Sequence, residues 1–182
     1  MNSRNHQNKE RGRASFLEAM SRMASTVSVI TTDGTAGRAG VTVSSLVSVS
    51  ADSPLPTLLV CIHKSSATCS VILKNGVFCA NVLRSDQQQI SEVFAGRIAS
   101  EHTDRFAQTD WVTENPGSPR LINPLAAFEC LITHSELVGQ HQVIFGEVYG
   151  LFIGSHDLPL IYANRAYGTS TAIPNNPAVK AA

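Results

Sequence analysis

Two long runs of strand-forming residues in the second half of the chain place the tightest constraint on how it can fold. Residues 126–138 and 141–153 are rich in β-branched and aromatic side chains, and only Gly139-Gln140 lies between them. Two such runs joined by a two-residue connection that contains glycine are typical of a β-hairpin. We therefore predict a long antiparallel hairpin near the end of a β-rich domain.

Further strands follow one another along the chain, whereas helices are few. We predict strands at residues 26–32, 41–49, 57–62, 77–83 and 159–163. The apolar run at 57–62 is continuous, which is typical of a strand covered on both faces. We predict helices that begin at Ser15, at Ser65 or Ser66, and at Ser85. Because no β-α-β alternation is present, this order favours a mainly β fold, an antiparallel barrel with appended helices.

The ends of the chain differ in composition from the middle. We predict a mobile tail over residues 1–13, one domain over residues 14–168 and a loose tail over residues 169–182, because both ends are polar or small and lack periodicity. Residues 99–124 are polar and hold three prolines, which indicates a long surface loop.

Charge and cysteine content restrict the partners and the compartment. The chain has 14 Lys and Arg against 14 Asp and Glu, so it lacks the basic excess of a nucleic-acid binder, and we expect self-association. No apolar run approaches the roughly 20 residues of a membrane span. The four cysteines lack C-x-x-C spacing, and the polar first residues do not resemble a secretory signal. We therefore expect a cytoplasmic protein.

Several common site motifs are absent from the sequence. It contains neither G-x-G-x-x-G nor G-x-x-x-x-G-K-[ST], so neither a Rossmann dinucleotide site nor a P-loop is predicted. It lacks H-E-x-x-H and its six histidines are scattered, so we predict no metal site. The absence of G-x-S-x-G argues against that class of hydrolase.

Hydroxyl side chains gather in two places that precede and follow a predicted strand. The first group is Thr42, Ser44, Ser45, Ser48 and Ser50, and the second is Ser65, Ser66 and Thr68, beside Lys64. Hydroxyls and backbone N–H groups at a strand end and a helix start can hold a phosphate. An alternative is that these residues face solvent and that Ser66 is an ordinary helix cap.

Two further residues are candidates for binding a planar ligand. His141 opens a strand, where an imidazole can donate a hydrogen bond to an amide or phosphate or act as acid or base, although a lone histidine is more often a simple surface or cap residue. Tyr167 can stack on a ring, or it can simply seal the barrel. From the residues alone, the interpretation stops at a β-barrel domain with an anionic ligand.

Seven blocks of the sequence, taken in order, resemble a known family. They are FLEAMSRMASTVSVITTDG, GVTVSSLVSVSADSP, LLVCIHKSSAT, FCANVL, FAG, GQHQVIFGEV and PLIYANRAYG. In this order they resemble the short-chain flavin reductases that form the reductase component of two-component aromatic monooxygenases, of the 4-hydroxyphenylacetate 3-monooxygenase reductase type. The resemblance covers roughly residues 14–168.

The resemblance implies an FMN-binding split β-barrel with Greek-key topology, usually a homodimer. It also implies reduction of FMN or FAD by NADH, or less often NADPH, and diffusion of the reduced flavin to a partner monooxygenase in aromatic compound degradation. By position, Thr42, Val43, Ser44, Ser45, Leu46, Ser48 and Val49 match the flavin ring and ribityl contacts. The phosphate contacts match Lys64, Ser65, Ser66, Ala67 and Thr68. Phe94 and Gly96 match the outer flavin contacts, and His141 and Tyr167 match the nicotinamide mouth, with His141 binding first and catalytic second.

Two departures and two alternatives accompany this resemblance. Gln140 stands where the family often has an acidic residue, and the ADSPLP segment has one residue more than its shorter form. One alternative is a flavin-binding electron carrier or sensor without NADH turnover. Another is a split-barrel enzyme of the pyridoxamine-phosphate oxidase type, which usually needs several arginines for two phosphates.

Overall fold

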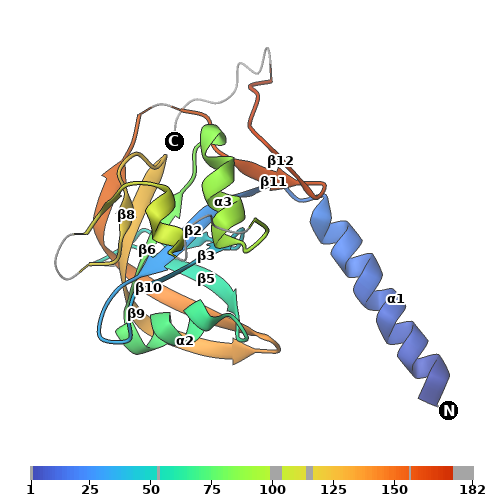
Figure 1. Cartoon of the computed structure of the whole chain (residues 1–182). Helices are drawn as coiled ribbons and strands as arrows, with labels where there is room; N and C mark the ends of the chain where they lie inside the picture. The colour runs from blue at the N-terminus through green and yellow to red at the C-terminus, as the bar shows by residue number, and fades with distance from the viewer. Residues whose placement is uncertain (1, 53, 99–103, 114–116, 156, 174–182) are drawn as a thin grey trace.

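The computed structural model describes residues 2–52, 54–98, 104–113, 117–155 and 157–173, and β-strands dominate it (Figure 1). The strands are β1 (Ser25–Thr26), β2 (Ser28–Thr32), β3 (Ala39–Val43), β4 (Val47–Ser50), β5 (Thr57–His63), β6 (Val77–Val82), β7 (Trp111–Val112), β8 (Arg120–Leu121), β9 (Ala126–Val138), β10 (His141–Ile153), β11 (Ile161–Ala163) and β12 (Ala166–Gly168). The helices are α1 (Asn2–Ser21), α2 (Ala67–Asn75) and α3 (Gln88–Phe94), with short 3₁₀ turns at Ser85–Gln87 and Arg105–Gln108.

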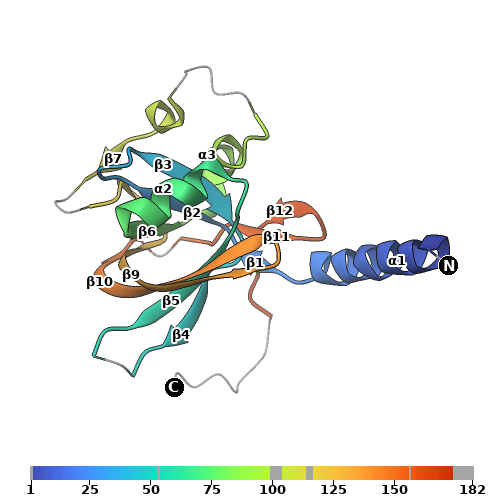
Figure 2. The same ribbon diagram turned by 90° about the horizontal axis from the view of Figure 1, so that it is seen from below.

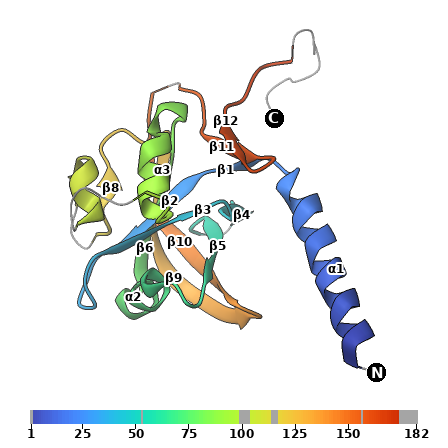
Figure 3. The same cartoon turned by 45° about the vertical axis from the view of Figure 1, so that its right-hand side comes forward.

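The main sheet has seven strands in the order β3-β2-β6-β9-β10-β5-β4, and all its pairs are antiparallel. Its two edge strands are consecutive in sequence, because only residues 44–46 separate β3 from β4. That connection spans at most about 14 Å, whereas a flat seven-stranded sheet is about 28 Å wide. The sheet therefore curls into an open barrel, with its two edges joined by this short connection (Figures 2 and 3). The predicted mainly β barrel class is confirmed.

The predicted hairpin is present with the predicted bounds. β9 and β10 pair from His141 with Val138 to Ile153 with Ala126, and Gly139 in the turn has a φ of 61°, a left-handed conformation that glycine adopts easily. The register shifts between Phe145 and Gly146. A side chain at Gly146 would meet the Phe78 ring at 2.6 Å, so this position lets the strand approach the core closely.

Three strand predictions need correction. The strand predicted at 41–49 is interrupted at residues 44–46, and its two parts, β3 and β4, are the opposite edge strands of the sheet. β5 alternates between buried and half-buried residues, with Leu58, Val60 and Ile62 facing the core, so it is not covered on both faces within this chain. The strand predicted at 26–32 is divided at Val27 into β1 and β2. The amide of Val27 donates to Leu160 and its carbonyl accepts from Leu83, which joins β1 and the neighbouring β11 and β12 to the barrel.

Two apolar clusters stabilise the fold. One fills the barrel and includes Ile30, Val60, Phe78 and Ile144, all fully buried. The other lies under α3 and includes Phe94 and Phe106. The four cysteines are free, and burial raises the pKa of the Cys130 thiol to about 12, so this thiol stays protonated and unreactive near neutral pH.

The helices agree only in part with the sequence. α2 begins after Ser66 and ends at Gly76, which has a φ of 72°, as predicted. α3 ends before Gly96, also as predicted. α1, however, begins at Asn2 rather than at Ser15, so the segment predicted as a tail continues the helix away from the barrel (Figure 1). No helix in the described ranges is both long and apolar enough to cross a membrane.

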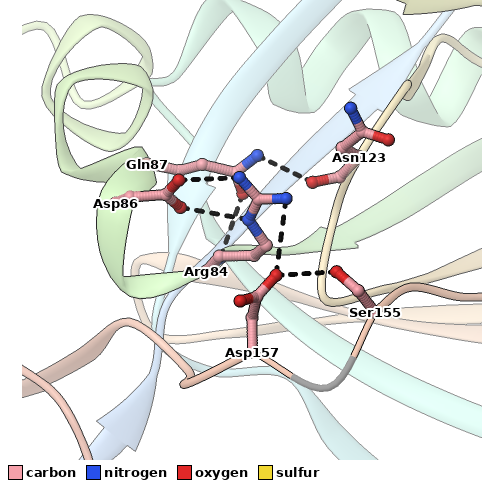
Figure 4. Close-up of polar contacts among 6 residues, drawn as sticks. All are labelled: Arg84, Asp86, Gln87, Asn123, Ser155 and Asp157. Atoms are coloured by element: carbon pink, nitrogen blue, oxygen red, sulfur yellow. Dashed lines mark hydrogen bonds and ion pairs between the residues drawn. The ribbon is translucent and has the colours of Figure 1, made fainter.

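A cluster of polar residues, Arg84, Asp86, Gln87, Asn123, Ser155 and Asp157, holds the start of α3 against two loops (Figure 4). The Arg84 guanidinium donates to both carboxylate oxygens of Asp86, at 3.0 and 2.7 Å, and lies 3.5 Å from Asp157. Gln87 donates to the carbonyl of Asn123 at 2.8 Å. We call this set the Arg84 cluster.

Candidate functional site

The largest concentration of predicted site residues lines a hollow of about 330 Å³ at the junction of the two sheet edges. The end of β3 and the connection that follows it form one side, through Thr42–Ser45, and the last residues of β5 with the first residue of β10 form the other. We call this the first hollow. Its lining residues are Val41, Thr42, Val43, Ser44, Ser45, Cys61, Ile62, His63, Ser66 and His141.

The Ser45 side chain fixes the connection between β3 and β4 onto β5. Its hydroxyl accepts a hydrogen bond from the Cys61 amide and donates one to the Cys61 carbonyl, both at 3.0 Å. One side chain thus takes the place of a strand partner where the β-ladder is interrupted. Ser45 therefore shapes the hollow, and its hydroxyl is already occupied.

Two histidines meet at the rim of the first hollow. His141, the first residue of β10, is paired in register with His63, the last residue of β5. Their ring centroids are 5.0 Å apart with an angle of 87° between the rings, an edge-to-face contact. His63 Nδ1 lies 2.7 Å from the Ser65 hydroxyl.

The segment predicted to bind phosphate is divided between two hollows. Ser66 faces the first hollow, whereas Ala67 and Thr68 line another hollow of about 330 Å³ together with Arg38 and Arg105. The Ser66 side chain makes no capping hydrogen bond, so it leaves the Ala67 and Thr68 amides at the start of α2 for an anion, whereas the Cys69 amide donates to the Ser66 carbonyl at 3.0 Å. Thr68 is buried and donates to the Gly40 carbonyl at 2.9 Å.

A second hollow, of about 140 Å³, lies on the other side of Thr42–Ser44. A polar chain crosses its wall: Thr42 donates to the Ser91 carbonyl at 2.7 Å, and the Ser91 hydroxyl bonds the Tyr167 hydroxyl at 2.8 Å. Arg97 donates to the Tyr162 hydroxyl at 3.3 Å. This hydrogen bond holds the pKa of Arg97 above its ordinary value, so the guanidinium keeps its positive charge. That charge lies beside the rings of Tyr162 and Tyr167.

Comparison with known proteins decides what kind of barrel carries these hollows. Residues 20–171 match the flavin reductase like domain. The chain belongs to this family. It is 42% identical over 162 residues to a protein of Ancylobacter novellus named FMN reductase (NADH) RutF, a match that covers 89% of this chain and 87% of that protein.

Solved structures of components of two enzyme systems share the fold. BorF, the flavin reductase component of a bacterial two-component tryptophan halogenase, is 26% identical with a TM-score of 0.77, over 86% of this chain and 97% of BorF. A Mycobacterium thermoresistibile homologue of nitrilotriacetate monooxygenase component B is 27% identical with a TM-score of 0.79, over 95% of this chain and 97% of that one. The split-barrel fold expected from the sequence is thereby confirmed.

The residues of this flavin reductase domain fit a flavin. A flavin combines a planar ring, which needs an open surface, with a phosphate, which needs N–H and hydroxyl donors. The Thr42–Ser44 segment forms a wall shared by two hollows, and Ser66, the residue directly before the uncapped α2, lines the first hollow. The structure therefore places donors suited to a phosphate next to a surface that can receive a ring.

The structure brings together only some of the predicted site residues. Thr42, Val43, Ser44, Ser45, Ser66 and His141 line the first hollow, but Tyr167 lies in the second, so His141 and Tyr167 do not share one mouth. Phe94 is 1% exposed inside the core under α3, so its ring faces no hollow. Predicted residues that line none of these hollows are Leu46, Ser48, Val49, Lys64, Ser65 and Gly96.

The sequence analysis missed several residues that line the first and second hollows, among them His63, Ser91, Arg97 and Tyr162. His63 reaches the site through the register of β5 with β10, and Ser91 reaches it through the bond from α3 to Tyr167. These contacts join residues more than 70 positions apart. The one local signal was the position of His63 directly before Lys64-Ser65-Ser66.

Proposed function

We propose that this flavin reductase oxidises NADH and reduces FMN in the first hollow. The observation that carries the proposal is the Thr42–Ser44 wall, which has His141 on one side and the uncapped start of α2 at its end. A bound flavin supplies hydride acceptance. The protein itself supplies binding, the alignment of two rings and the exclusion of water.

Each part of the hollow has a task in this proposal. Ser66 and the first N–H groups of α2 hold the phosphate, and Lys64 adds a positive charge nearby. Backbone N–H groups of the Thr42–Leu46 segment bond the polar edge of the ring, since the Ser45 side chain is engaged with Cys61. His141 contacts the nicotinamide. Hydride transfer needs no acid or base, so the binding role of His141 comes before a catalytic one.

The proposal favours FMN and NADH over FAD and NADPH. It is supported by the relative from Ancylobacter novellus, whose name states FMN and NADH. The match with that relative covers 89% of this chain. We include FAD and NADPH as weaker substrates of the same site.

We further propose that the reduced flavin leaves the protein and diffuses to a partner monooxygenase that acts on an aromatic compound. Support comes from the resemblance of the sequence blocks and from BorF, which serves a tryptophan halogenase. We also propose a cytoplasmic homodimer. Exposed apolar side chains on α1, β4 and β10, such as Phe16, Val47 and Ile153, support an interface between two copies.

The test mixes purified protein with NADH and FMN and follows the nicotinamide absorbance band. Rapid loss of the band supports the proposal, and repeating the assay with FAD and NADPH ranks the substrates. No loss with any of the four combinations would overturn it. A yellow protein that never oxidises NADH would instead indicate a carrier or sensor. Flavin delivery is tested by placing an oxygenase behind a dialysis membrane, where product should still form.

A further inference from the structure

His63 lies where the loop that starts α2 meets the β9–β10 hairpin. Its carbonyl accepts a hydrogen bond from the Ser66 amide at 2.9 Å, and the next amide, that of Lys64, donates to the Gln140 carbonyl at 2.9 Å. The ring of His63 contacts the ring of His141 edge-to-face. One residue thus touches the predicted phosphate loop on one side and the predicted nicotinamide contact on the other.

The hydrogen bonds of the His63 ring determine which of its nitrogens carries the proton. The Ser65 amide donates to Nδ1 at 3.2 Å. An amide can only donate, so Nδ1 must be the acceptor, and the proton of the neutral ring lies on Nε2. The Ser65 hydroxyl, 2.7 Å from the same nitrogen, then also donates to it. Two donors from one residue hold this ring in one orientation.

We propose that His63 is a positioning residue that couples the phosphate loop to His141. This inference rests on the proposed function. A phosphate bound at Ser66 orders the loop that also carries Ser65, the Ser65 amide and hydroxyl fix the His63 ring, and the edge-to-face contact between the two rings fixes His141. The nicotinamide then meets a histidine that is already ordered, so its binding costs less conformational entropy.

The proposal predicts that NADH binding depends on the flavin phosphate. Riboflavin has the same ring as FMN but lacks the phosphate, so it leaves the loop empty. In the natural protein, the KM for NADH should be about fivefold lower with FMN than with riboflavin, the size expected for one fixed hydrogen bond or ring contact. Because coupling between two ligands is reciprocal, NAD⁺ should tighten FMN binding more than riboflavin binding.

The decisive variant is His63→Phe, which keeps a ring beside His141 but removes the Nδ1 acceptor. It should abolish the difference between FMN and riboflavin in the KM for NADH, and kcat should change little. His63→Asn, which lacks the ring, should do the same. His134→Phe is the matched control, because His134 lies on β9 of the same sheet, exposed and packed on Phe145, and it should preserve the difference.

Equilibrium binding gives a second readout that does not depend on turnover. FMN and riboflavin are titrated by fluorescence with and without NAD⁺, in the natural protein and in the three variants. Loss of the FMN-specific effect of NAD⁺ in both His63 variants, with His134→Phe unchanged, supports the proposal. Retention of the effect in either His63 variant overturns it. If the natural protein oxidises NADH but shows no phosphate effect, His63 has no coupling role while the proposed function stands. If the natural protein oxidises no NADH, both proposals fail.

Discussion

The first hollow and the Arg84 cluster are both rich in polar side chains, but they use them differently. In the Arg84 cluster the charged groups face one another: Arg84 is bound by two carboxylates, and Asp157 also accepts from the Ser155 hydroxyl at 2.7 Å. In the first hollow, Ser44 and His141 line an open space of about 330 Å³. Paired groups hold loops together, whereas groups that face open space are available to a ligand.

The comparison separates stability from binding. The Arg84 cluster joins the start of α3 to the loops around Asn123 and Asp157 (Figure 4), so changes there should alter unfolding and leave substrate binding as it is. Changes in the first hollow should instead alter substrate binding and leave unfolding as it is. Each of the following predictions tests one side of this separation.

Among the three predictions on this separation, His141→Ala has the largest expected effect. Loss of the imidazole should raise the KM for NADH about tenfold, the upper range for one lost hydrogen bond, because the nicotinamide loses its contact. FMN affinity and the urea midpoint should stay close to those of the natural protein, since His141 is exposed. Steady-state kinetics measure the KM for NADH, an FMN titration measures the FMN affinity, and urea unfolding measures the midpoint. Equal losses for NADH and FMN would contradict the assignment of His141.

Arg84→Met should have a smaller effect on the other side of the comparison. It should lower the free energy of unfolding by about 1 kcal/mol, the upper range for a partly exposed ion pair, because Asp86 and Asp157 lose their common partner. Urea unfolding measures this change. The KM values for NADH and FMN should not move. A change in either KM without a change in the free energy of unfolding would contradict the separation of stability from binding.

The smallest predicted effect is a dependence on acid pH. Hydrogen bonds from Arg84 hold the pKa of Asp86 below its ordinary value. A carboxyl whose pKa is lowered in the folded state stabilises the fold at pH values above its unfolded pKa of about 4. That stability is lost as the pH falls through the lower folded pKa. The difference in urea midpoint between the natural protein and Arg84→Met should therefore shrink below about pH 4. Asp86→Asn should show the same trend, and a difference that stays constant to low pH would refute it.

The sequence predicted best those elements whose signals are local. The β9–β10 hairpin follows from two β-rich runs around Gly139, and α2 follows from a serine cap and Gly76. The first half of α1 was missed because residues 2–13 are polar and show no helical apolar stripe. The exposure of one side of β5 was missed because a continuous apolar run looks the same in a strand covered on one face or on two.

The site was predictable only as far as its residues are close in sequence. Thr42–Ser45 are contiguous in sequence, so these residues must lie together at the place where the strand ends. The pairing of His63 with His141 depends on the register of β5 with β10, and the separation of Tyr167 from His141 depends on the position of β12. Local composition determines neither the register of β5 with β10 nor the position of β12. The core position of Phe94 likewise depends on its packing with Phe106 and Trp111.

The central claim is that the wall between the two hollows receives the flavin, and Ser44→Phe tests it most directly. Ser44 is exposed and lines both hollows, so a phenyl group there fills the space for the ring without disturbing the core. Fluorescence titration should show no FMN binding at concentrations that saturate the natural protein. Thr35→Phe, in the exposed turn after β2, should bind FMN normally. If Ser44→Phe binds FMN as tightly as the natural protein, the flavin does not lie on this wall.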